Sequence, residues 1–251
     1  MLAIRITGIL DDPRRRECAD RLRSKHNTRS KMCAIVGCYL EQPTEDQIES
    51  LKRLFIESQI RGRHQTGLAM KQHDKIWSYK VDGDGTELVK KFDWSTLKGQ
   101  STLQIAGHCR YSTSDLRYPQ PIHIFQDFAL CHNGVVDQRS PVYWKEYGYE
   151  LTTANDSELL YQAAYSGKEP LIEFPEASMA VCEVSGKFGL RWYRNGKRPL
   201  YHIKVENGYF ICSTADIAKR AGLRNARRCK PGVIYTPSKR SKITNVEELI
   251  P

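Results

Sequence analysis

Cys33 is the residue best placed to do chemistry, because of what stands on either side of it. Met32-Cys33 opens an apolar run, Ala34-Ile35-Val36-Gly37, that is typical of the start of a protein. Methionine aminopeptidases remove Met before a small residue, so a chain started at Met32 would expose Cys33 as its N-terminal residue. Its α-amine would then titrate near ~7.7–8.0 and could take the thiol proton at neutral pH. This predicts a nucleophile and its base within one residue; the alternative is a buried Cys on a first strand.

Four further short segments carry polar and charged groups that could serve a reaction. They are Arg61-Gly62 within residues 60–69, the segment 107–113, His132-Asn133-Gly134, and Asn155-Asp156-Ser157-Glu158. We expect them between the regular elements, at strand ends and helix starts, where functional groups are usually placed. Each alone also has an ordinary structural interpretation, as a strand end, a tight turn or a helix cap.

The elements that must position these segments follow from hydrophobic periodicity. Helical spacing predicts a helix over 45–59, opened by a capping box at Thr44 and Gln47, and a second helix over 156–166. Strands are predicted over 33–40, 67–71, 76–81, 103–106 and 128–131. Two hairpins follow, one pairing 178–184 with 188–194 and one pairing 200–205 with 209–213 around Asn207-Gly208. Helices flanking many antiparallel strands predict an α+β fold with packed sheets.

Charge divides the chain of 251 residues unevenly. Residues 1–31 hold nine Lys and Arg against four Asp and Glu, which is half of the net charge of +10. We interpret 1–31 as a basic N-terminal extension (a propeptide, a tail or a misassigned start) and 32–251 as one domain. The extension could bind nucleic acid weakly through phosphates, but no nucleic-acid-binding motif accompanies it.

Composition excludes several other classes of protein. The absence of an apolar stretch near the ~20 residues of a membrane span argues against a membrane protein, and no secretory signal opens the chain. The eight Cys include no Cys-x-x-Cys pair and no zinc spacing. We therefore expect buried, reduced cysteines, a cytoplasmic protein, and neither a metal nor a cofactor.

In this order after Met32-Cys33, the segments resemble the class II glutamine amidotransferase domain, an N-terminal nucleophile (Ntn) hydrolase. Arg61-Gly62 is similar to its first active-site loop, 107–113 to its glutamine-carboxylate loop, His132-Asn133-Gly134 to its oxyanion motif, and Asp156-Ser157-Glu158 to its amine-binding helix start. A shortened Arg-x-x-x-Gly-x-Arg-Pro-Leu stretch follows at 194–200. The resemblance covers residue 33 to about residue 237 and implies a four-layer αββα sandwich of two mainly antiparallel sheets.

The resemblance also implies the site residues, and their chemistry fits hydrolysis of a glutamine side-chain amide. Cys33 is the expected nucleophile, and the Asn133 amide with the Gly134 N–H is the expected oxyanion cradle. Arg110 suits the substrate α-carboxylate, since guanidinium binds carboxylates bidentately, and Asp156 suits the α-ammonium. The remaining expected substrate-binding residues are Thr113, beside the carboxylate, and Arg61, in the first loop.

Three features depart from the family pattern. Ser114-Asp115 follows the carboxylate loop where the family often has Gly or His-Gly, and His64-Gln65-Thr66 replaces the usual Pro-Asp-small sequence. Cys33 is internal as the sequence is written, and an internal Cys has no α-amine.

These features leave several functions open. The first is a glutaminase that supplies ammonia to a separate acceptor synthase, because little chain follows residue 237. The second is a stand-alone amidase on another γ-glutamyl compound. The third is a non-catalytic regulatory module that retains the extension. A Cys/His protease using His108 or His132 is a weaker rival, since no orienting Asn or Asp is spaced recognisably.

Overall fold

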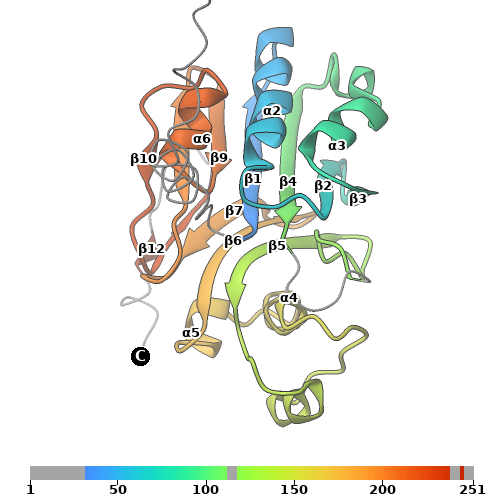
Figure 1. Cartoon of the computed structure of the whole chain (residues 1–251), viewed down its shortest axis with the longest axis vertical. Helices are drawn as coiled ribbons and strands as arrows, with labels where there is room; N and C mark the ends of the chain where they lie inside the picture. The colour runs from blue at the N-terminus through green and yellow to red at the C-terminus, as the bar shows by residue number, and fades with distance from the viewer. Residues whose placement is uncertain (1–31, 112–117, 238–243, 246–251) are drawn as a thin grey trace, which may run out of the picture. The chain divides into compact units, whose positions relative to one another are not determined.

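The computed structural model describes residues 32–111, 118–237 and 244–245. Within these ranges, two antiparallel sheets face each other (Figure 1). The larger has seven strands in the order β10 (Arg227–Arg228), β8 (Tyr201–Val205), β9 (Gly208–Cys212), β1 (Ala34–Glu41), β4 (Thr102–Arg110), β2 (Gln65–Gln72) and β3 (Lys75–Asp82). The smaller has five in the order β12 (Thr244–Asn245), β11 (Val233–Tyr235), β7 (Gly189–Arg194), β6 (Ser178–Ser185) and β5 (Phe128–Val135).

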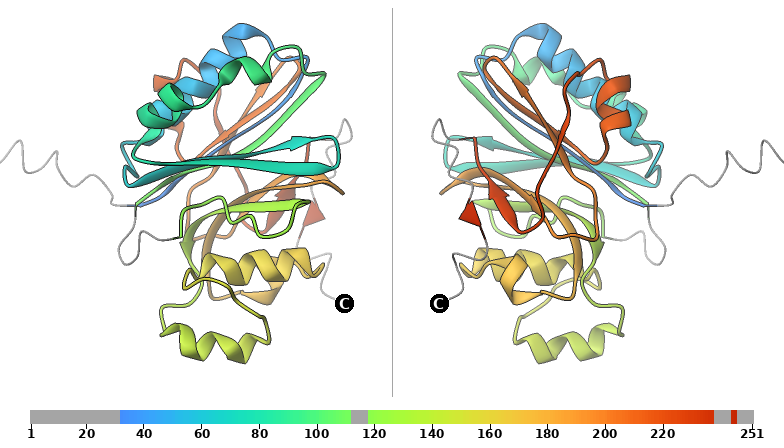
Figure 2. Two further views of the ribbon diagram at one scale, coloured as in Figure 1. Left: turned by 90° about the vertical axis from the view of Figure 1, so that its right-hand side faces the viewer. Right: turned by 90° about the vertical axis from the view of Figure 1, so that its left-hand side faces the viewer.

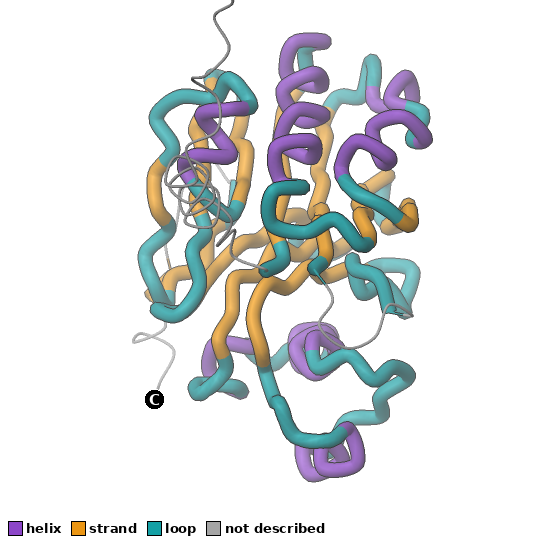
Figure 3. Tube along the Cα trace, in the orientation of Figure 1, coloured by secondary structure: helices purple, strands orange, loops and turns teal. Residues whose placement is uncertain are grey.

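Helices cover the outer face of each sheet (Figure 2). The larger sheet carries α2 (Glu45–Ser58), α3 (Gly85–Lys91), the 3-10 helix η1 (Trp94–Leu97) and α6 (Ala215–Arg220). The smaller sheet carries α4 (Ser157–Tyr165) and α5 (Pro170–Glu173). A second 3-10 helix, η2 (Pro141–Tyr147), lies in the long connection between β5 and α4 (Figure 3). The predicted αββα sandwich is therefore confirmed.

Three apolar clusters hold the layers together. One lies between the large sheet and its helices and includes Leu51, Leu54 and Phe55 of α2. A second lies between the small sheet and α4. The third lies between the two sheets and includes Ile35 and Trp192. Six of the seven described cysteines are buried and all seven are free thiols, as expected for small hydrophobic residues.

The sheet-to-sheet cluster fixes the direction of the polar side chains at one end of the strands. Ile35 of β1, Ala106 of β4 and Cys131 of β5 all belong to it. Because side chains alternate along a strand, Cys33, Arg110 and Asn133 are directed into the same space between the sheets. Pairing of Ala34 with Cys109 also places residue 33 opposite residue 110. Antiparallel pairing thus brings together groups that are far apart in the chain.

Two predicted boundaries were wrong in a way that matters for the site. The strands predicted over 103–106 and 128–131 extend as far as Arg110 and Val135. Segments 107–110 and 132–134 therefore lie inside strand ends rather than between elements. The apolar pattern stops early there because His108, Arg110 and Asn133 are polar although they are buried. In the described part of the chain, no helix is both long enough and apolar enough to span a membrane.

Candidate active site

Cys33 is half-buried directly before β1, and its backbone and thiol are both held. The thiol Sγ donates to the Tyr111 carbonyl at 3.6 Å, and Arg61 Nε donates to the Cys33 carbonyl at 3.0 Å. Burial raises the pKa of the Cys33 thiol, which the guanidiniums of Arg110 and Arg61 oppose and the carboxylate of Asp156 reinforces. Since burial is the largest of these effects, the thiol needs a base to become a nucleophile at neutral pH.

A cavity of about 720 Å³ opens at this end of the sheets. Its wall contains Cys33, Arg110, Gly134 and Asp156, which were predicted from four separate segments of the sequence. The cavity is therefore lined by a thiol, a guanidinium, the backbone of a strand end and a carboxylate. Further wall residues come from the connection between β5 and α4, among them Arg139 and Trp144.

Arg61 takes a different position from the one expected of a substrate-binding residue. It is 9% exposed and grips the Cys33 carbonyl rather than lining the described cavity wall. The turn that carries it lies directly on β4, where a side chain at Gly62 would place its Cβ 2.4 Å from the Cys109 carbonyl oxygen. Glycine at this position therefore lets the loop approach and fixes Arg61 against the start of β1.

Arg110 is 8% exposed and is oriented by a backbone carbonyl. Its Nη1 donates to the Tyr118 carbonyl, which also accepts from Asn155 Nδ2 at 3.4 Å. This shared acceptor ties the end of β4 to the residue before Asp156. Thr113, predicted to assist Arg110, lies outside the described residues.

Asn133 carries a buried donor for which the described residues offer no hydrogen-bond acceptor. The residue is 2% exposed, and within the described part of the chain its Nδ2 has no hydrogen-bond partner. An unsatisfied buried donor of this kind costs about 1–3 kcal/mol, so it calls for an explanation. The next residue must be glycine, because a Cβ at Gly134 would lie 1.7 Å from the Ser178 carbonyl oxygen.

A closed polar network fixes the strand on which Asn133 lies. His132 N donates to Gln120 Oε1 at 2.6 Å, and Gln120 Nε2 donates to Ser157 Oγ at 3.1 Å. The His132 ring contacts Ser157 Oγ through Nδ1 at 2.9 Å and the Ser178 carbonyl through Nε2 at 3.2 Å. A carbonyl only accepts, so Nε2 carries the proton and Nδ1 accepts from the Ser157 hydroxyl. Burial lowers the pKa of His132, in agreement with a neutral ring.

The segment Asp156-Ser157-Glu158 divides its three side chains among three tasks. Asp156 lines the cavity, and its Oδ2 accepts from Val136 N at 2.7 Å. Ser157 belongs to the His132 network. Glu158 is fully buried and accepts four hydrogen bonds, from the backbone N–H and the hydroxyl groups of Thr152 and Thr153, at 2.6–2.9 Å. The start of α4 is thus a junction rather than a simple helix cap.

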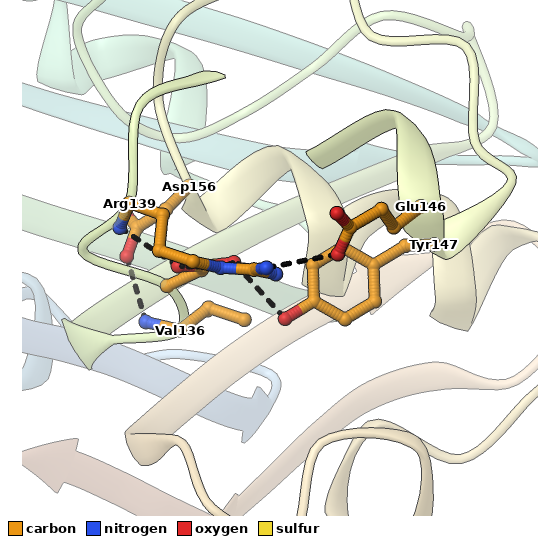
Figure 4. Close-up of polar contacts among 6 residues, drawn as sticks. Val136, Arg139, Glu146, Tyr147 and Asp156 are labelled. Atoms are coloured by element: carbon orange, nitrogen blue, oxygen red, sulfur yellow. Dashed lines mark hydrogen bonds and ion pairs between the residues drawn. The ribbon is translucent and has the colours of Figure 1, made fainter. Parts of the chain in front are cut away.

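A clamp of charged residues braces the connection that supplies Val136 (Figure 4). The Asp137 carboxylate accepts from the Arg139 guanidinium at 2.8 Å and from the Tyr147 hydroxyl at 3.1 Å. Arg139 also donates to Glu146 at 2.8 Å. Because Val136 and Asp137 are adjacent, the clamp keeps the Val136 N–H directed at Asp156. We attribute the orientation of the Asp156 carboxylate to this arrangement.

The two histidines weighed for a protease do not act on the thiol in this geometry. His132 is occupied as described, and burial lowers the pKa of His108 to about 3. No hydrogen bond joins either ring to Cys33 within the described ranges; the thiol contacts the Tyr111 carbonyl instead. The geometry therefore gives no support to a Cys/His pair.

The sequence prediction missed Arg198, which lies beside the residue before Cys33. Its Nε donates to Ser178 Oγ at 3.1 Å, and its Nη1 is 3.1 Å from Met32 Sδ. The signal was present as the second Arg of the shortened motif at 194–200, to which no role was given.

Comparisons with known proteins agree with the observed fold. No protein-family model matches the chain. Over 111 residues it is 32% identical to the glutamine--fructose-6-phosphate aminotransferase (isomerizing) of Pyrococcus horikoshii, a match that covers 42% of this chain and 17% of that protein. The structure is similar to glutamine phosphoribosylpyrophosphate amidotransferase from B. subtilis, with a TM-score of 0.60, 21% identity, and 80% of this chain covered.

The matched chain is longer than this one, since the similarity spans 46% of the B. subtilis protein. A protein from Silicibacter pomeroyi described as a glutamine aminotransferase class-II domain protein matches over 82% of this chain and 96% of its own, with a TM-score of 0.51 and 11% identity. The structure therefore shares the fold of these solved glutamine amidotransferase structures, and part of its sequence is similar to that of the Pyrococcus horikoshii protein.

Proposed function

We propose that this protein hydrolyses the side-chain amide of glutamine through Cys33 as its N-terminal residue, releasing glutamate and ammonia. The observation that carries the proposal is the convergence of Cys33, Arg110, Gly134 and Asp156 on one cavity. Together these groups suit both charged ends of a free amino acid and leave the thiol to attack its side chain.

In the proposed reaction, the Cys33 α-amine takes the thiol proton and Sγ attacks the amide carbon of the substrate. The oxyanion that forms accepts from Asn133 Nδ2 and the Gly134 N–H, which explains the otherwise unsatisfied amide. The leaving nitrogen takes the proton back from the α-ammonium as the carbon–nitrogen bond breaks. Water then hydrolyses the thioester, which gives the γ-carboxylate and restores the thiol.

Recognition of the substrate is assigned to the charged wall residues. Arg110 binds the α-carboxylate, with Thr113 as a further donor, and Asp156 binds the α-ammonium through the carboxylate that Val136 orients. Arg61 holds the Cys33 carbonyl, so its proposed role is to position the nucleophile. We propose that the ammonia passes to a separate synthase; two of the relatives are named as an aminotransferase and an amidotransferase.

The test compares two forms of the protein for ammonia release. In an uncleaved chain the nitrogen of Cys33 is an amide and cannot act as a base, so we expect that chain to be inactive. A chain that begins at Cys33 should hydrolyse glutamine. Cys33→Ala in the shorter form should abolish activity and, as a small change at a half-buried site, leave folding intact. Equal activity from a full-length chain shown by mass to be uncleaved would contradict the mechanism, and would leave the N-terminal amine without its role.

The size of the cavity favours a second candidate, an amidase on a larger γ-glutamyl compound. Its volume of about 720 Å³ lies in the upper part of the ~300–1,000 Å³ range of pockets that hold drug-sized ligands. The glutamyl half would be bound as above, and only the leaving group would differ. A preference for a bulky γ-glutamyl amide over glutamine of more than about tenfold in kcat/KM would favour this candidate.

A further inference from the structure

The Arg198 guanidinium lies beside Met32, close to the start of β1, and its contact with Met32 is a weak one. Arg198 Nε is held by Ser178 Oγ at 3.1 Å, which aims the other end of the guanidinium at residue 32. There Nη1 lies 3.1 Å from Met32 Sδ, and a thioether sulfur is a poor acceptor for a cation. A carboxylate would be a far stronger partner for the same group.

The chemistry of the site gives the direction in which a leaving group departs. This step rests on the function proposed above. The α-amine of Cys33 must return a proton to the scissile nitrogen, so that nitrogen lies against the backbone nitrogen of residue 33. Whatever substituent the nitrogen carries therefore extends toward the place that Met32 holds in the uncleaved chain. Arg198 borders that place, because its Nη1 lies 3.1 Å from Met32 Sδ.

Two guanidiniums, those of Arg198 and Arg61, lie near this position. Burial lowers the pKa of Arg61 and that of His132, and Arg198 is close enough to both groups to add to each shift. Arg61 donates to the Cys33 carbonyl, so of these two described guanidiniums Arg198 is the one that we assign to a leaving group. A neutral or cationic leaving amine would gain nothing there.

We propose that Arg198 is a specificity-determining residue that binds a carboxylate on the leaving amine, so that among substituted γ-glutamyl amides those of amino acids are hydrolysed in preference to those of neutral amines. The reaction is hydrolysis: Sγ forms a thioester as the carbon–nitrogen bond breaks, and the amino acid leaves with the proton from the α-ammonium. Water then releases glutamate. No other reactant is needed.

The experiment uses the chain that begins at Cys33 and two probes of nearly equal size, γ-glutamylglycine and γ-glutamylglycinamide, with glutamine as reference. We expect wild-type kcat/KM to favour the charged probe by about tenfold or more. Arg198→Gln removes the charge but keeps a donor for Ser178, and should reduce the ratio to near one. Arg198→Lys should retain part of the preference. Lys197→Met removes a cation from the same loop whose Nζ donates to the Glu176 carbonyl, and should leave the ratio unchanged.

The ratio of kcat/KM for the two probes separates a loss of specificity from structural damage. A disturbance of Ser178 or of the oxyanion cradle would lower kcat/KM for both probes alike. If Arg198→Gln does not fold, the wild-type ratio and Arg198→Lys still decide. A wild-type ratio near one, or a preference that survives Arg198→Gln, would overturn the inference while glutamine hydrolysis continued. Failure of the wild type to hydrolyse glutamine and both probes would instead overturn the proposed function.

Discussion

Replacing Asn133 by Ala should affect stability and turnover very differently, with little change in the free energy of unfolding and a large fall in kcat. The Asn133 amide is 2% exposed and its Nδ2 has no hydrogen-bond partner among the described residues. Leaving such a donor buried costs about 1–3 kcal/mol, and Ala removes that cost while it leaves only a small void. The two effects oppose each other. We therefore expect the free energy of unfolding to change by less than about 1 kcal/mol, in either direction.

The same substitution should be severe for turnover. The partner of Nδ2 in the proposed mechanism is an oxyanion that exists only in the transition state. Removal of one such donor costs about 2.7–4 kcal/mol, or a factor of ~10²–10³ in kcat. Ground-state glutamine is held by other groups, so KM should stay nearly constant.

Asn195 provides a matched control, because its amide is fully used. Asn195 Nδ2 donates to the Ala177 carbonyl, and its Oδ1 accepts from Met179 N at 3.1 Å. Asn195→Ala should lower the free energy of unfolding by about 1–3 kcal/mol and leave kcat almost unchanged. Urea unfolding and steady-state ammonia release, measured on all three proteins, give both quantities. An Asn133→Ala protein that turned over normally, or that lost more than about 2 kcal/mol of stability, would refute the reasoning.

Three further changes test other parts of the molecule. Arg110→Lys keeps the charge but loses the bidentate geometry, so KM for glutamine should rise at least about tenfold in steady-state assays. Glu158→Gln places an amide N–H₂ donor against the donors of Thr152 or Thr153. The free energy of unfolding in urea should therefore fall by about 2–4 kcal/mol. Burial raises the pKa of Glu169 to about 7, against ~4.3 when unfolded, although Arg191 opposes the shift. The protonated form is thus favoured by folding, and about 2–4 kcal/mol of stability present below pH ~4.3 should be lost as the pH rises through 7. Glu169→Gln should remove this loss; a wild-type stability curve parallel to that of the variant would contradict it.

The sequence allowed the fold and the location of the site to be predicted because the signals were local or were carried by the family resemblance. Helix α2 follows from its capping box, which the structure contains as Thr44 and Gln47. The convergence of Cys33 with Arg110 and Asp156 followed from segment order once the resemblance was recognised, and one cavity now contains all three. The chemical roles of these residues stay predictions.

Other features could not be predicted, because they arise from contacts between distant segments. Arg198 meets Met32 across 166 positions of the chain, and no local pattern encodes that distance. The length of β4 was underestimated because buried His108 and Arg110 interrupt the apolar run. Hydrophobic periodicity identifies buried positions only where they carry apolar residues. It misses the end of a strand whose buried residues are polar and hydrogen-bonded.

The position of the bond before Cys33 connects the chemistry of the thiol to the choice of substrate. Burial raises the pKa of the thiol, so the nucleophile depends on a base, and the backbone nitrogen becomes a base only when Met32 is removed. The same removal vacates the place beside Arg198, where we propose that the leaving group binds. Arg61 already holds the Cys33 carbonyl while Met32 is attached. One cleavage would therefore create the base and open the leaving-group side together, which couples activation of the nucleophile to access of the substrate.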